Sequence, residues 1–195
     1  MTDLPVKRAS VLRADTTAIL VVDVQERLLG AMPEAVLPAL EKNLRTLAVL
    51  ARELELPVVV SEQYPKGLGP TWPPLLEALE GHESLEVYEK LSFSVVGNGS
   101  IREALERLAP RTTLLVVGLE AHICVLQSCL DLIERGFRVH LAVDATASRR
   151  KLHWAQACRT LEKAGVTITN VETFAFRLLS GADAPAFKAI SRAIR

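Results

Sequence analysis

Three side chains in the sequence could together perform nucleophilic chemistry. Asp23 and Lys90 each follow a predicted strand, at residues 18–22 and 85–88, and Cys124 lies where a third strand leads into a predicted helix. A carboxylate can accept the thiol proton and later deliver it to a leaving amine. A neighbouring lysine favours both the ionised carboxylate and the thiolate. The thiolate can attack a carbonyl carbon, and water then releases the acid from the acyl-thioester.

The predicted position of Cys124 favours a reactive thiol. Unpaired N–H groups and the dipole at the start of a helix stabilise an anion, so we expect a lowered pKa for this thiol. Backbone N–H groups of residues 119–124 are available to hold a developing oxyanion. Each of the three residues also has an ordinary structural explanation: a buried thiol, a capping or loop carboxylate, and a surface lysine. Cys129 and Cys158 lie in apolar stripes and are expected in the core.

Short apolar runs alternate with longer amphipathic stretches along the chain. The predicted strands are residues 18–22, 58–61, 85–88, 114–117, 139–143 and 166–169. Apolar residues at helical spacing occupy residues 38–54, 101–108, 125–133 and 154–161. This rhythm predicts an α/β fold with a parallel sheet covered by helices on both faces. Ligands of such sheets bind beyond the carboxyl ends of the strands, where the three candidate residues are expected.

Composition limits the class of protein. The chain has 195 residues and 21.3 kDa, which fits one domain, and it is 49% hydrophobic and 24% charged. Lys and Arg number 23, as do Asp and Glu, so a nucleic-acid partner is not expected. No apolar run approaches the ~20 residues needed to cross a bilayer, so no membrane partner is expected. The lack of a secretory signal and the odd number of cysteines, 3, predict a cytoplasmic protein.

The motifs of nucleotide and metal sites are missing. The first strand is not followed by a glycine-rich dinucleotide fingerprint, and the chain has no GxxxxGK[ST], GxSxG or HExxH sequence. The histidines are scattered, and no pair of cysteines has the spacing of zinc ligands. We therefore expect no cofactor and no metal, and a small molecule as the substrate.

The longest irregular stretch, residues 63–74, is a candidate binding loop. It contains four prolines and two glycines together with Tyr64 and Trp72, either of which could form a pocket wall. Gln25 follows Asp23 closely enough to orient substrate or water, and Phe93, near Lys90, is a further candidate for substrate contact. Each of these side chains also has an ordinary explanation in packing or loop hydrogen bonding.

Three segments in order carry a resemblance to a known family. Residues 18–25 (AILVVDVQ), 90–94 (KLSFS) and 118–125 (GLEAHICV) resemble the signature regions of the isochorismatase-like cysteine hydrolases. Residues 62–69 (EQYPKGLG) and 131–136 (DLIERG) are similar to the branch called isochorismatase domain-containing proteins. The resemblance implies a three-layer α/β/α, Rossmann-like single domain over the whole chain. Its six-stranded, mainly parallel sheet would have the strand order 3-2-1-4-5-6.

The same resemblance implies a catalytic Asp–Lys–Cys triad at Asp23, Lys90 and Cys124. It also implies a non-proline cis peptide between Leu119 and Glu120, which would turn the Glu120 N–H toward the same point as the Cys124 N–H. Members usually form homo-oligomers, and residues 183–195 could contribute to such an interface.

The chain departs from the nicotinamidases of this family in two ways. Those enzymes carry an Asp and two His around a metal after the second strand, where residues 61–65 here read SEQYP, so no metal is carried over. Glu120 stands where nicotinamidases typically have a small residue. A carboxylate beside an oxyanion would raise the barrier, so the side chain must point away, be paired, or meet a cationic substrate.

These observations predict a cofactor-independent cysteine hydrolase that forms an acyl-thioester on Cys124 and acts on a small amide C–N bond. The resemblance to the family does not by itself fix the bond, because isochorismatases proper cleave a vinyl ether. Two alternatives remain open. The chain could be an interaction protein that kept the scaffold without turnover, or a redox protein in which Cys124 cycles through a sulfenic acid.

Overall fold

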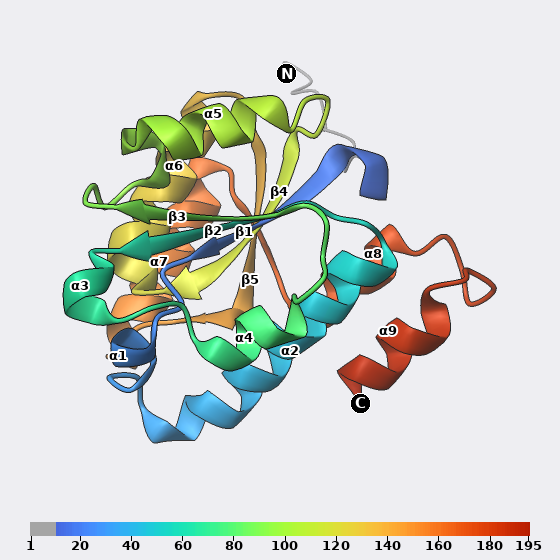
Figure 1. Ribbon diagram of the computed structural model, residues 1–195, viewed down its shortest axis with the longest axis horizontal. Coiled ribbons are helices and arrows are strands. Elements are labelled where there is room, and N and C mark those ends of the chain that lie inside the picture. The colour runs from blue at the N-terminus through green and yellow to red at the C-terminus, as the bar shows by residue number, and fades with distance from the viewer. Residues whose placement is uncertain (1–10) are drawn as a thin grey trace, which may run out of the picture.

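The computed structural model describes residues 11–195, and its centre is a six-stranded sheet (Figure 1). Its strands are β1 (Thr17–Val22), β2 (Val58–Gln63), β3 (Leu85–Lys90), β4 (Thr113–Leu119), β5 (Arg138–Ala147) and β6 (Thr167–Thr169). Every neighbouring pair is parallel, and the order is β3-β2-β1-β4-β5-β6. The predicted α/β class and strand order are confirmed.

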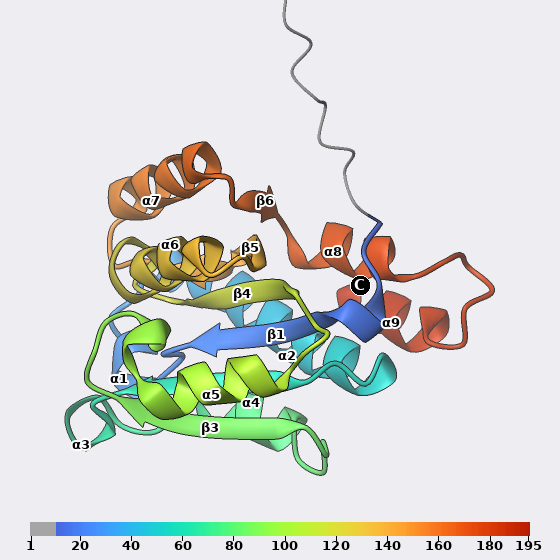
Figure 2. The same cartoon turned by 90° about the horizontal axis from the view of Figure 1, so that it is seen from above.

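Helices cover both faces of this sheet. The longer helices are α2 (Leu37–Glu53), α5 (Gly99–Arg107), α6 (Leu126–Glu134), α7 (Lys151–Ala164), α8 (Val171–Leu178) and α9 (Phe187–Ile194). The shorter ones are η1 (Ala14–Thr16), α1 (Glu26–Leu29), η2 (Glu34–Val36), α3 (Pro65–Leu68), α4 (Pro73–Ala78), η3 (Val95–Gly97) and the π-helical turn η4 (Ala121–Val125). Figures 1 and 2 show α5, α6 and α7 on one face and α2, α8 and α9 on the other.

The central strand β1 explains why its sequence is apolar without alternation. Ile19 and Val21 point into the core under α2, while Ala18 and Leu20 point into the core under α5 and α6. All six residues of the strand are buried. A strand covered on both faces is stabilised by apolar side chains at every position, which is the pattern that predicted it.

One region differs from the sequence-based expectation, and a second, residues 183–195, packs within the chain while its expected part in an oligomer contact stays a prediction. The stretch 63–74 is less irregular than predicted, because its prolines begin two short helices, α3 and α4. Residues 183–195, suggested as an oligomer contact, contain α9, which packs on α2 of the same chain. Ile190 is fully buried there, and Thr46 Oγ1 on α2 donates to Ala193 O at 3.0 Å.

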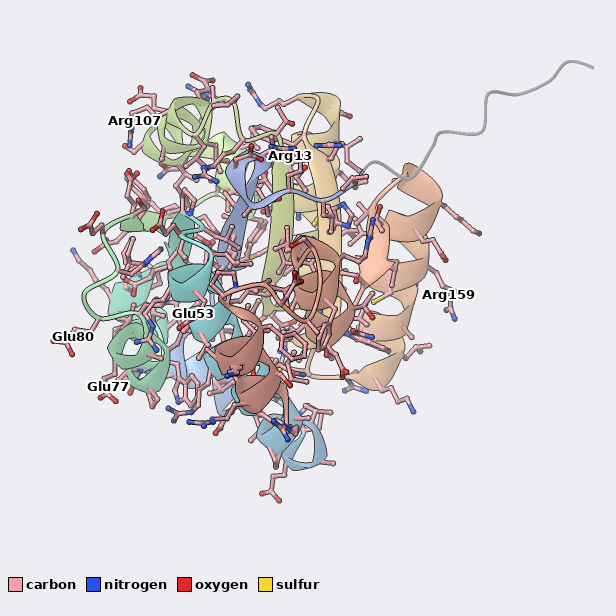
Figure 3. The ribbon with its side chains drawn as sticks, turned by 90° about the vertical axis from the view of Figure 1, so that its right-hand side faces the viewer. Arg13, Glu53, Glu77, Glu80, Arg107 and Arg159 are labelled. Carbon is pink, nitrogen blue, oxygen red and sulfur yellow. The ribbon has the colours of Figure 1, made fainter. Side chains whose placement is uncertain are left out.

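The surface carries charges of both signs. Figure 3 shows labelled examples at the surface, with arginines and glutamates interspersed around the molecule: Arg13, Glu53, Glu77, Glu80, Arg107 and Arg159. Within residues 11–195, no helix combines the length and the apolar character that crossing a membrane requires.

Gly118 allows β1 and β4 to approach at the edge where the candidate residues lie. It pairs with Val22 and has φ 148°, and a Cβ built on it would lie 2.1 Å from Val22 O. We expect Gly118→Ala to lower the free energy of unfolding by at least about 3 kcal/mol, through backbone strain and overpacking. Chemical denaturation measures this loss.

Gly136 provides the matched control for this substitution. It also has a positive φ, 86°, but nothing lies within 4 Å of its built Cβ. Gly136→Ala should therefore cost only the backbone term of about 1–2 kcal/mol. Equal losses for the two variants would show that the contact with Val22 is unimportant.

Candidate active site

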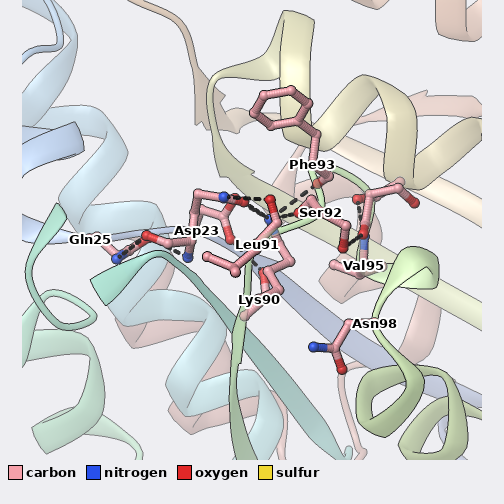
Figure 4. A network of polar contacts seen from close by, with 12 residues as sticks. Asp23, Gln25, Lys90, Leu91, Ser92, Phe93, Val95 and Asn98 are labelled. Carbon is pink, nitrogen blue, oxygen red and sulfur yellow. Dashed lines mark hydrogen bonds and ion pairs between the residues drawn. The ribbon is translucent and has the colours of Figure 1, made fainter. Parts of the chain in front are cut away.

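Asp23, Lys90 and Cys124 meet at the carboxyl edge of the sheet. Asp23 follows β1, Lys90 ends β3, and Cys124 lies in η4, just beyond β4. Lys90 Nζ lies 2.8 Å from Asp23 Oδ2, and both side chains are fully buried (Figure 4). Asp23 also acts on the Cys124 thiol, whose pKa it raises through its negative charge and through hydrogen bonding. The structure therefore brings the three predicted side chains into one polar cluster.

Backbone geometry at the end of β1 turns Asp23 into this cluster. Its φ of 55° lies in the left-handed region, where a non-glycine residue costs about 1–3 kcal/mol and persists only when its surroundings fix it. Ser61 fixes it twice: Asp23 N donates to Ser61 O at 3.0 Å, and Ser61 Oγ donates to Asp23 Oδ1 at 2.7 Å. With Lys90 on its other oxygen, the buried carboxylate has the partners that burial of a charge requires.

Lys90 is held by acceptors on every side. Besides Asp23, its Nζ donates to Gln63 Oε1 at 2.7 Å and to the carbonyl oxygens of Phe93 and Ser92 at 3.1 and 3.2 Å. Gln63 is fixed in turn, because its Nε2 donates to Leu91 O at 3.0 Å. These four acceptors supply the hydrogen bonds that a fully buried ammonium group requires.

Cys124 is a buried thiol rather than an exposed thiolate. It is 5% exposed. Burial and the negative charge of Asp23 raise its pKa to about 12, while Lys90 acts in the opposite direction. The prediction of a lowered pKa is therefore wrong. Desolvation outweighs any helix dipole here, because α6 begins only at Leu126, after the π-helical turn.

The turn before Cys124 differs from the predicted one. Within residues 11–195 the one cis peptide bond joins Ala109 to Pro110, so the Leu119–Glu120 bond is trans, and the prediction of a cis bond there is wrong. The chain changes direction instead through the left-handed conformation of Glu120, with φ 55° and ψ 59°. The role of the N–H groups of residues 119–124 as an oxyanion site stays a prediction.

Glu120 is paired, which is one of the three arrangements that the sequence left open. Its side chain is 6% exposed, and Arg149 Nε donates to its Oε1 at 2.7 Å. His122 Nδ1 lies 3.3 Å from the other oxygen, Oε2, and 3.0 Å from Ser148 Oγ. The carboxylate beside Cys124 therefore faces a guanidinium group.

Gln25 positions a loop and does not face solvent. Its side chain is fully buried, its Oε1 accepts from Gln63 N at 2.7 Å, and its Nε2 donates to the carbonyl oxygens of Gln63 and Gly69 at 3.1 and 2.6 Å. Backbone groups of Gln63 and Gly69 thus occupy both amide hydrogens and one of the two lone pairs of the amide oxygen. The structure gives this buried side chain the task of holding the loop, and its contact with substrate stays a prediction.

The three aromatic candidates lie in different places. Tyr64 is 51% exposed and lines a cavity of about 560 Å³ together with Lys66, Leu91 and residues 97–99. Phe93 is 53% exposed and points away from Lys90 and Asp23 (Figure 4). Trp72 packs against the core under α2, where its ring lies 5.0 Å from Arg45 Cζ. Trp72 therefore contributes to packing, and its contact with substrate stays a prediction.

The described residues contain no group of three or more His, Cys, Asp or Glu side chains that could hold a metal ion. Cys124, Cys129 and Cys158 are free thiols. The site brings together a thiol with a carboxylate and an ammonium group, of which the last two are in direct contact.

Comparison with known proteins identifies the family. The model of the Isochorismatase domain matches residues 17–173. The chain belongs to the isochorismatase family. The secreted isochorismatase effector Isc1 of Phytophthora sojae is 34% identical, over 97% of this chain and 89% of that protein. Isochorismatase domain-containing protein 2 of Rattus norvegicus is 31% identical, over 93% and 82%.

Two solved structures share the fold of this chain. The MAR1 ribonuclease of Caenorhabditis elegans has a TM-score of 0.86 and 35% identity, over 95% of this chain and 92% of that one. YcaC of Escherichia coli, described as an octameric hydrolase of unknown specificity, has a TM-score of 0.86 and 21% identity, over 96% and 92%. The second likeness shows the shared fold alone.

Sequence reasoning missed several residues of this isochorismatase-family site. Ser61 and Gln63 hold Asp23 and Lys90, and Arg149 pairs with Glu120. Strand register was a usable signal for Gln63, because it lies directly beside Lys90 in the β2–β3 pair. Arg149 gave no comparable signal, since it follows β5 and reaches Glu120 across the end of the sheet.

Proposed function

We propose that this isochorismatase-family protein, acting as one domain, is a cofactor-independent hydrolase that cleaves the C–N bond of a small amide. The proposed intermediate is an acyl-thioester on Cys124. The observation that carries this proposal is the contact between the Cys124 thiol and a buried Asp23 carboxylate, which is itself ion-paired to a buried Lys90. This arrangement supplies a nucleophile, a base and a counter-charge.

Asp23 acts as the base and then as the acid. As Cys124 Sγ bonds to the carbonyl carbon, the thiol proton passes to Asp23 and the carbonyl oxygen gains the negative charge. The protonated Asp23 then gives that proton to the amide nitrogen, the C–N bond breaks, and the amine leaves. Water adds to the acyl-thioester with Asp23 accepting its proton. The acid is released when the proton returns to sulfur.

The raised pKa of Cys124 fits a mechanism in which attack and proton transfer occur together. A thiol with a pKa of about 12 is almost entirely protonated at neutral pH, so a base within hydrogen-bond reach is required. Asp23 meets this requirement, and Lys90 stabilises the carboxylate before the transfer.

We also propose a homo-oligomer in a reducing compartment. Leu91 and Phe93, in the turn after β3, are 76% and 53% exposed, which is unusual for apolar side chains beside a site. The three free thiols suit a reducing environment such as the cytoplasm. A monomeric mass by light scattering would contradict the homo-oligomer. Export of the native chain from the cell would contradict the reducing compartment.

Mass spectrometry of the acyl-enzyme tests the proposed function. The wild-type protein is incubated with a panel of small amides and esters, quenched in acid and digested. We expect the mass of the acyl group on the peptide containing Cys124, and its disappearance as product forms. The half-buried Cys158 serves as an internal control and should stay unmodified.

Other mass changes would favour the alternatives. Equal acylation of Cys124 and Cys158 would indicate nonspecific reactivity and contradict a built site. Addition of oxygen to Cys124 with peroxide, without acylation by any amide, would favour the redox protein. No modification under either condition would favour an interaction protein.

A further inference from the structure

The carboxylate of Glu120 is a negative charge buried beside the nucleophile. Residue 120 is 4% exposed and immediately precedes the turn that carries Cys124. Its charge is one of the influences that raise the pKa of the Cys124 thiol. Its Oε2 is buried and has no hydrogen-bond partner. In the proposed reaction, both the attacking sulfur and the tetrahedral adduct develop negative charge next to this carboxylate, so an uncompensated Glu120 would oppose the reaction.

Among the described residues, one cation is available to offset Glu120. Lys90 is committed to Asp23 and lies among carbonyl oxygens. Burial lowers the pKa of His122, so its imidazole is mainly neutral near pH 7, and His153, whose ring centre lies 4.6 Å away, adds a further cause of that lowering. The guanidinium group of Arg149 remains, and its Nε donates to Glu120 Oε1 at 2.7 Å.

We propose that Arg149 is a positioning residue of the reaction, which neutralises Glu120 and fixes the turn that carries Cys124. This inference rests on the proposed function. Arg149 uses its Nε for the contact, from a side chain that is 58% exposed, while the carboxylate it holds is 6% exposed. The guanidinium group therefore acts on the buried turn from outside, and it contacts neither Asp23 nor Lys90.

The geometry explains how a carboxylate is tolerated at this position. Burying Glu120 without a partner would strongly penalise its charged form. The hydrogen bond from Arg149 to Oε1 fixes the side chain, while Oε2 lies 3.3 Å from His122 Nδ1 without forming a hydrogen bond. The strained left-handed backbone of Glu120 is then held by its own side chain.

Substitutions at the two positions separate charge compensation from simple packing. Arg149→Met removes the cation, Glu120→Gln removes the charge that it offsets, and the double variant removes both. Arg149→Lys restores a cation without the guanidinium geometry. Arg150→Met is the matched control, because it removes an exposed arginine from the adjacent position with no contact to Glu120.

The main measurement is the alkylation rate of Cys124 by iodoacetamide between pH 6 and 10, followed on its peptide by mass spectrometry. This readout needs no substrate. We expect Arg149→Met to slow alkylation about tenfold at a given pH, which corresponds to a rise of one unit in the thiol pKa. Glu120→Gln should alkylate at least as fast as wild type, the double variant should resemble Glu120→Gln, and Arg149→Lys should recover part of the loss.

Two results would overturn the inference. One is an equal alkylation rate of Cys124 in Arg149→Met and Arg150→Met. The other is that Arg149→Met slows alkylation as much in a protein that already carries Glu120→Gln as it does in the wild type. If Arg149→Met does not fold, Arg149→Lys and the double variant still distinguish these outcomes. If an amide acylates Cys124 but the effect of Arg149→Met does not depend on Glu120, this inference is wrong and the proposed function stands. If the effect of Arg149→Met does depend on Glu120 but no amide acylates Cys124, the proposed function is wrong and this inference about the thiol stands.

Discussion

Replacing Cys124 with alanine should abolish acyl-enzyme formation and lower amide turnover by at least about 10,000-fold, the loss expected when a nucleophile is removed. No second thiol can substitute. Cys129 is fully buried on α6, and Cys158 lies on α7, away from the Asp23 carboxylate that contacts Cys124. Steady-state kinetics and intact-mass measurement after an acid quench provide the two readouts.

Cys129→Ala is the control for this substitution. It removes the same sulfur atom from a buried position that has no contact with the polar cluster, so it should reduce stability while leaving turnover nearly unchanged. The two variants then separate a chemical effect from a folding effect. Equal turnover by Cys124→Ala and wild type would contradict the proposed nucleophile. Unchanged function of Cys124→Ala in a binding assay would favour an interaction protein.

The architecture could be predicted from sequence because burial on both faces leaves a local signal. The strand β1 is apolar at each of its positions, and the helices that cover it repeat apolar residues at helical spacing. Those patterns placed Asp23 and Cys124 after strands, and parallel pairing brings strand ends to one edge. The order of the strands came from the resemblance to the family, since periodicity does not specify which strands are neighbours.

The electrostatics of the site could not be predicted in the same way. The pKa of Cys124 depends on how far its sulfur is removed from water and on its contact with Asp23, and neither property is local in the sequence. Arg149 could not be predicted for the same reason, because its partner Glu120 follows a different strand, β4, and lies 29 residues earlier in the chain. Gln25 shows a related difficulty, because closeness to the predicted base suggested a contact with substrate and gave no sign that backbone groups are its hydrogen-bond partners.

Replacing Lys90 with methionine should lower the free energy of unfolding by about 3–5 kcal/mol, the range for breaking a buried ion pair from one side. Methionine fills a similar volume, but the Asp23 carboxylate keeps its charge in a fully buried position without its cation. Loss of the counter-charge also disturbs proton transfer between Asp23 and the reacting groups. Turnover should fall about 100-fold or more. Chemical denaturation and kinetics measure the two effects.

The double variant Asp23→Asn with Lys90→Met decides whether this loss comes from the unpaired charge. It removes both charges while keeping an amide that can accept from Ser61 Oγ, so most of the lost stability should return. Turnover should not return, because asparagine cannot accept the thiol proton of Cys124. Recovery of stability without activity would separate the two roles of this ion pair. If the double variant is as unstable as Lys90→Met alone, the lysine stabilises the protein through its contacts with Gln63 and the carbonyl oxygens after β3, and the argument from charge pairing is wrong.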